Sequence, residues 1–244
     1  MSTNNFTKTI VDRISQFCKE VGFNKSAGKF NCKINENVTA WLHFGIANYH
    51  STDRYVCPTV GIKYNDISNL SRALYGYIPH DTWGTPLGYL MPENTYKEWQ
   101  FCCDSDNEQS FADMFDSIRT YAFPTINELS SIDGLLKYLD KQPITLPLAL
   151  YTIGDYQKGL AIIEQRIDQQ RKKLQRPAIK RLFMADGQIV EEELLDEESL
   201  RKAYRQKLPE QVESMEIVGA DRGGVDPSYL EFYEKYKRLC NGTL

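Results

Sequence analysis

The chain has 244 residues, which is enough for one large domain or two small ones with a buried core. Hydrophobic residues make up 41% of it and charged residues 25%, the usual balance of a globular protein. The net charge of −4 argues against a broad nucleic-acid-binding surface, because such surfaces usually need a basic face.

The distribution of apolar residues and cysteines indicates the cytoplasm. No stretch approaches 18 consecutive apolar residues, and the first residues lack the pattern of a secretory signal. None of the six cysteines forms a Cys-x-x-Cys pair, and most lie among apolar neighbours, as reduced core cysteines do. We therefore expect a cytoplasmic protein with no membrane span.

The first part of the chain begins with a helix and continues with strands. Apolar residues recur at helical spacing from 6 to 21. Residues 30–34 alternate with period two and are followed by turn residues, so the stretch 38–50 is expected to return as an antiparallel strand. A third strand is expected at 55–64, where Pro58 indicates an edge position or a bulge because proline cannot donate to the ladder.

The next elements complete an α+β domain. Residues 66–75 favour a short helix, 95–103 a further strand, and 105–121 an amphipathic helix. Residues 76–94 are rich in glycine and proline, and a loop of that length is usually functional or packed down by its own aromatic residues. These elements predict a domain over 1–123, in which an antiparallel sheet of about four or five strands packs on helices.

The remainder, 124–244, is predicted to be a helical region with a charged C-terminal segment. Two helices are expected on either side of a tight turn at Gly154-Asp155. Charge density then rises sharply, and Asp226-Pro227 provides an N-cap and an N1 proline for a final helix.

The three histidines give little support for catalysis or metal binding. His43 and His50 are seven residues apart, so in a regular strand they lie on opposite faces and do not share a metal ion. His80 lies in the long loop beside Asp81, and these two are the fallback catalytic candidates. No nucleophile elbow, phosphate-binding loop, His-Glu-x-x-His or dinucleotide fingerprint occurs. The sequence therefore assigns no catalytic residue, no metal ligand and no cofactor.

Two groups of residues are candidates for contact with a partner protein. Trp83 and Tyr89 are aromatic residues of the long loop. Glu191, Glu192 and Glu193 form an acidic block, which is either a solvated face or a docking surface for a basic partner.

Two resemblances to known families add to this description. The segment "LYTIGDYQKGLAIIEQ", 150–165, resembles the middle of a tetratricopeptide repeat, which implies a helical hairpin. The stretches "EVGFNK", "KFNCKI", "WLHFGI" and "YVCPTVGIKY" make residues 6–70 resemble the bacterial domain of unknown function 4304. That resemblance implies a bacterial origin and a binding role, often beside polymorphic toxins and their immunity partners, and it transfers no catalytic residue.

The leading hypothesis is a non-enzymatic, cytoplasmic protein that binds another protein, with an immunity protein that neutralises a basic toxin as its specific form. Two alternatives stay open. One is a hydrolase with carboxylate or His80 chemistry in the loop 76–94. The other is a structural component of a larger phage or secretion assembly.

Overall fold

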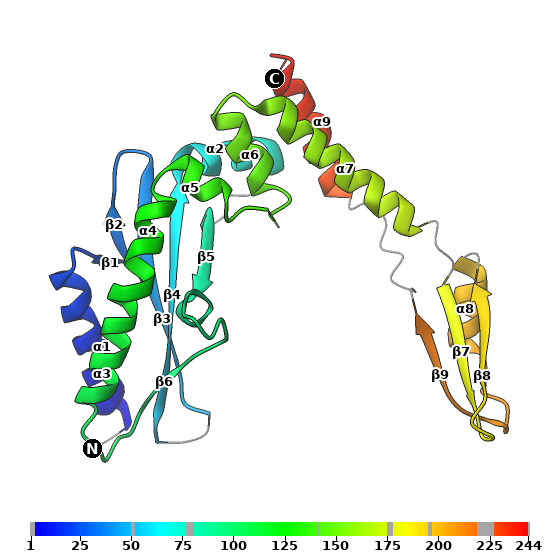
Figure 1. The fold of residues 1–244 in the computed structure, drawn as a ribbon, viewed down its shortest axis with the longest axis horizontal. Coiled ribbons are helices and arrows are strands. Elements are labelled where there is room, and N and C mark those ends of the chain that lie inside the picture. Colours follow the sequence, from blue (N-terminus) through cyan, green and yellow to red (C-terminus); the bar gives the residue numbers. More distant parts are fainter. Residues whose placement is uncertain are drawn as a thin grey trace. The chain divides into compact units, whose positions relative to one another are not determined.

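A computed structural model describes residues 3–49, 52–76, 81–140, 142–174, 178–194, 197–218 and 227–243 of the chain. These residues form two compact units, Met1–Gly159 and Leu160–Leu244, and each is described by itself (Figure 1). The boundary between the two units therefore lies after Gly159, whereas the sequence pattern predicted a boundary after residue 123. None of the helices in the described ranges combines the length and the apolar character that crossing a bilayer requires.

The first unit is built on a six-stranded antiparallel sheet, which confirms the predicted α+β class. The strand order is β1-β2-β3-β4-β5. A sixth strand, β6, pairs with the beginning of β4, on the side where β5 pairs with its second half. The strands are β1 (Asn24–Ser26), β2 (Lys29–Lys33), β3 (Val38–Ala47), β4 (Arg54–Tyr64), β5 (Trp83–Pro86) and β6 (Trp99–Phe101).

Helices cover one face of this sheet and enclose the main core (Figure 1). Alternation sends Phe30, Leu42 and Val60 to this face, where they join Ile14 of α1 and Met114 of α3. The helical elements are α1 (Thr3–Glu20), α2 (Asn65–Tyr75), η1 (Leu87–Leu90), α3 (Glu108–Ser117), η2 (Ile118–Ala122), α4 (Phe123–Leu129), α5 (Ile132–Leu136) and α6 (Thr145–Thr152).

Pro58 lies in a central strand, not at an edge. The main-chain N–H of Thr82 donates to the carbonyl of Ile62, so the even-numbered residues of β4 direct their main-chain groups toward β5 and β6. On that side β6 ends its pairing at Val56 and β5 begins at Thr59. Pro58 falls in the gap between the two neighbours, so its missing N–H removes no ladder bond.

The second unit contains a sheet that the sequence pattern did not predict. Where a charged helical segment was expected, three strands pair antiparallel in the order β8-β7-β9. An Asp186-Gly187 turn joins β7 to β8, with Gly187 in the left-handed region at φ 82°. The elements are α7 (Tyr156–Leu174, which begins in the first unit), β7 (Ala178–Met184), β8 (Ile189–Leu194), α8 (Glu197–Arg205), β9 (Val212–Val218) and α9 (Pro227–Cys240).

The predicted turn at Gly154-Asp155 is confirmed, because α6 ends and α7 begins on either side of it and Gly154 has φ 83°. Inside the predicted long loop, β5 and η1 are regular elements, so part of that loop belongs to the sheet and its covering layer.

Candidate functional site

On the sheet face away from the main core, the side chain of Trp41 lies across two neighbouring strands. Trp41 of β3 is 5% exposed and covers Gly61 of β4 and Gly84 of β5. A Cβ at Gly84 would lie 2.7 Å from the indole, and one at Gly61 would overlap it. On the other side of the ring, Lys29 places its Nζ 3.7 Å from the ring centre. The protein's own side chains therefore close this part of the face.

Asp81, one of the two fallback catalytic candidates, takes part in this closure. Its Oδ1 accepts from Lys29 Nζ at 2.6 Å, and both side chains are about one quarter exposed. The carboxylate is thus engaged by an ammonium group that also stacks on Trp41. His80, the other fallback candidate, lies outside the described residues.

Farther along the same face, three tyrosines gather around one carboxylate. Tyr49 and Tyr96 each donate from Oη to the same oxygen, Oε1 of Glu98, at 2.8 Å. Tyr55 adds its ring at 5.1 Å from that of Tyr49. Tyr49 is 59% exposed and Tyr96 54%. We call these four residues the tyrosine cluster.

Strand pairing explains why residues distant in sequence meet there. The register sets Gln100 of β6 opposite Tyr55 of β4. Tyr96 and Glu98 come just before β6, and the hydrogen bonds to Glu98 place them beside Tyr49. Tyr49 follows β3 with a φ of 37°, which is unusual for a residue other than glycine. The bond from its phenol to Glu98 helps to hold this conformation, and such strain is found more often at functional positions than elsewhere.

The electrostatics of the cluster favour binding over acid–base chemistry. The hydrogen bond to Glu98 raises the pKa of both phenols, Tyr49 and Tyr96. Burial raises the pKa of the neighbouring Cys57 thiol. At neutral pH the phenols therefore remain donors and the thiol remains protonated. Among the described residues, only these two phenols donate to Glu98, and both use Oε1.

Of the two histidines in the stretch 38–50, the structure describes His43. His43 is exposed on the same face as Trp41, as the parity of the strand predicts. His50 lies outside the described residues. Within the described ranges, no three histidine, cysteine or acidic side chains are grouped to hold a metal ion.

The aromatic residues proposed as partner contacts lie apart from the tyrosine cluster. Trp83 is half-buried on β5, with its ring 5.3 Å from that of Tyr138 in an edge-on arrangement. Tyr89 lies in η1 and is 46% exposed. Neither makes a described contact with the cluster.

The acidic block lies on β8 in the second unit and is divided between two faces. Glu192 accepts from the buried Lys180 at 2.9 Å, on the side where α8 packs. Glu191 and Glu193 point to the opposite face, where Glu191 accepts from Arg181 at 2.7 Å. Only Glu193 of the three has no ion pair with a described residue.

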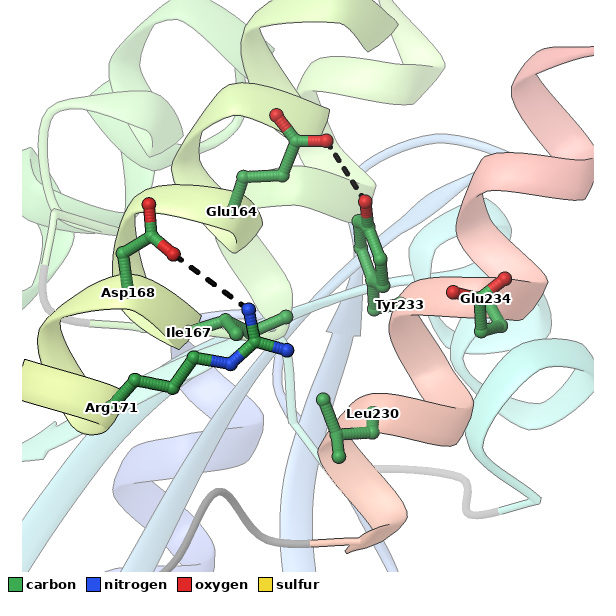
Figure 2. Close-up of a pocket in the computed structure, with 7 residues that line it drawn as sticks. All are labelled: Glu164, Ile167, Asp168, Arg171, Leu230, Tyr233 and Glu234. Atoms are coloured by element: carbon green, nitrogen blue, oxygen red, sulfur yellow. Dashed lines mark hydrogen bonds and ion pairs between the residues drawn. The ribbon is translucent and has the colours of Figure 1, made fainter. Parts of the chain in front are cut away.

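A groove of about 450 Å³ lies between α7 and α9 in the second unit (Figure 2). Its floor is apolar and its rim mainly acidic, but two of the three rim carboxylates are engaged with other groups of the rim. Tyr233 donates to Glu164 at 2.9 Å, and Arg171 lies 4.0 Å from Asp168. The lining residues are Glu164, Ile167, Asp168, Arg171, Leu230, Tyr233 and Glu234.

Comparison with known proteins adds no further constraint. No family model, no curated protein and no solved structure matches this chain. The resemblance of residues 6–70 to domain of unknown function 4304 therefore stays a prediction.

One local pattern indicates part of the tyrosine cluster. In "TYKEWQF", Tyr96 and Glu98 are two residues apart, as residues that share one face of an extended segment are, but they lie far in the sequence from Tyr49 and Tyr55. The pairing of β6 with β4, which brings the two groups together, has no local signal.

Proposed function

We propose that this chain is a non-enzymatic protein-binding protein whose partner contacts the tyrosine cluster. The observation that carries the proposal is the fixing of two half-exposed tyrosines, Tyr49 and Tyr96, by a single carboxylate oxygen of Glu98. A solvated sheet face needs only polar residues, whereas this one presents ordered aromatic rings.

Ordered tyrosines are suited to this role for an energetic reason. Binding normally loses about 0.5–1.5 kcal/mol for each flexible side chain that it immobilises. Tyr49 and Tyr96 are already held by Glu98, so a partner would meet surface that loses little further freedom. Tyrosine is enriched at the energetic centres of interfaces because its ring buries a large area and keeps a polar end.

The chemistry of the cluster favours a partner that presents a cationic side chain. Glu98 has its second oxygen, Oε2, without a described donor, and the aromatic rings beside it attract cations by their faces. The net charge of −4 adds long-range attraction for a basic protein. The specific form that we propose is an immunity protein that binds a basic toxin, which rests on this charge and on the resemblance of residues 6–70.

Site-specific photo-crosslinking in the cells that make this chain tests the proposal. A benzophenone amino acid replaces Tyr49 in one version and Tyr156, an exposed tyrosine outside the cluster and outside the other candidate contacts, in the matched control. We expect one discrete adduct from position 49, its loss when Glu98→Ala is added, and no such adduct from position 156. No adduct at either position, or the same adduct at both, would contradict the proposal. If the captured protein is a toxin, it should arrest growth alone and be harmless when this chain is co-expressed.

A further inference from the structure

Among the described residues of the second unit, β8 pairs on one side only, and the main-chain groups on its other side can be located. Met184 N–H donates to the Gln188 carbonyl at 2.9 Å, which makes these two residues a hydrogen-bonded pair. Hydrogen-bonded and non-hydrogen-bonded pairs alternate along an antiparallel ladder. Ile189, Glu191 and Glu193 therefore direct their N–H and C=O groups away from β7, toward the free side of β8.

The same three residues project their side chains to the sheet face opposite α8. On the α8 side, Leu194 packs with Ala203, and Ile217 packs against both. On the other side, Ile189 is 58% exposed although it is a large apolar residue in a regular strand. An added strand would supply backbone bonds and apolar contact together.

The charge of this region determines which strand fits. Residues 178–218 contain ten acidic and six basic side chains, a net charge of −4, while Met1–Gly159 contains 17 and 14, a net charge of −3. Per residue, the negative charge of the smaller segment is about five times denser. A second copy of β8 would set glutamates against glutamates, which is unfavourable across a strand pair. A segment with lysine or arginine in alternate positions would meet them favourably.

We propose that an extended, basic segment of a partner protein pairs with the free edge of β8 as a fourth strand. The N–H and C=O groups of Ile189, Glu191 and Glu193 would bond to its main chain, which is the usual mode of strand addition. Its basic side chains would lie beside Glu191 and Glu193. This contact is independent of the tyrosine cluster, which belongs to the other unit.

The test uses the full-length purified chain and a fluorescent peptide, acetyl-Lys-Val-Lys-Val-Lys-Val-Lys-amide, followed by anisotropy. Glu193→Lys reverses a charge at the β8 edge without breaking a described ion pair. The matched control, Glu213→Lys, makes the same change at an exposed position on β9, the opposite edge. We expect saturable binding, weakened about two- to tenfold by Glu193→Lys and unchanged by Glu213→Lys.

A second variant and a second peptide separate strand pairing from charge attraction. Glu193→Gln should weaken binding by less than Glu193→Lys, and circular dichroism of both variants should match that of the parent protein. A peptide of the same charge with proline in place of each valine cannot form the ladder and should not bind. Equal binding of the proline peptide, equal weakening by the β8 and β9 variants, or no binding of the lysine–valine peptide would each overturn the proposal.

Discussion

Gly61→Ala should destabilise the first unit, because the new methyl group would occupy space that the Trp41 indole fills. A Cβ at this position would overlap the six-membered ring of Trp41 and lie 2.5 Å from the main-chain oxygen of Trp83. The φ of Gly61 is outside the left-handed region, so alanine can adopt the backbone conformation. The penalty therefore comes from packing alone.

The structure sets bounds on the size of this penalty. Trp41 is 5% exposed, and a buried aromatic side chain of this kind removes about 200 Å² from water. At about 25 cal/mol per Å², complete expulsion of the indole would cost about 5 kcal/mol. Overpacking that small shifts can absorb costs about 1–3 kcal/mol. The oxygen of Trp83 belongs to the main chain and cannot rotate away, so we expect a loss of about 3 kcal/mol.

Urea unfolding followed by tryptophan fluorescence measures the effect on the first unit, because all three tryptophans lie in it. Gly45→Ala is the matched control on the same sheet face, since a Cβ there meets only the Cys57 oxygen at 3.8 Å. That control should leave stability unchanged or raise it by up to about 1 kcal/mol. Equal unfolding midpoints for the Gly61 and Gly45 variants would refute the packing of Trp41 on β4.

Two further outcomes test the electrostatics of each unit. Glu98→Gln should lower the pKa of the Tyr49 and Tyr96 phenols toward that of free tyrosine, because the bond to Glu98 is the largest cause of their raised pKa. A pH titration of ¹³Cζ-labelled tyrosine by NMR would show this decrease. Unchanged pKa values would contradict the shared hydrogen bond. In the small sheet, Glu192→Ala leaves the buried ammonium of Lys180 without its carboxylate and should destabilise this sheet by about 1–3 kcal/mol. Lys180→Met should be neutral or stabilising, as expected when an apolar side chain replaces a buried charge. Amide hydrogen exchange on β7 would measure the stability of the sheet in both variants. An equal loss of stability in Glu192→Ala and Lys180→Met would argue against a desolvated ion pair.

Period-two patterns were sufficient to predict β2 and β4 of the first unit, whereas β1 was not predicted and β5 lies inside the predicted loop. Alternation along 30–34 and 55–64 follows directly from one buried face, so β2 and β4 are found near their predicted positions. Pro58 was interpreted from its chemistry alone, as an edge or bulge. The central strand β4 tolerates this proline because β6 ends and β5 begins on either side of it, and that arrangement depends on long-range strand pairing.

The second sheet escaped prediction because its strands are rich in glutamate, a residue depleted in strands. The local signal for this sheet is Asp186-Gly187, a dipeptide typical of tight turns between two strands. The tyrosine cluster could not be assembled from sequence for a different reason. Tyr49 and Glu98 are 49 residues apart and meet only because β6 pairs with β4.

The two proposed contacts differ in the forces that stabilise them, and salt should separate their contributions. The tyrosine cluster offers large rings and one carboxylate, so much of its energy comes from apolar burial, which salt screens little. The β8 edge lies in the acidic segment 178–218 and offers exposed carboxylates. At physiological ionic strength, salt largely screens the attraction between such carboxylates and lysines that are more than about 8–10 Å apart. A partner held mainly at the cluster would remain bound at high salt. A partner held mainly at β8 would dissociate, so the ionic strength at which a captured partner is released indicates which unit holds it.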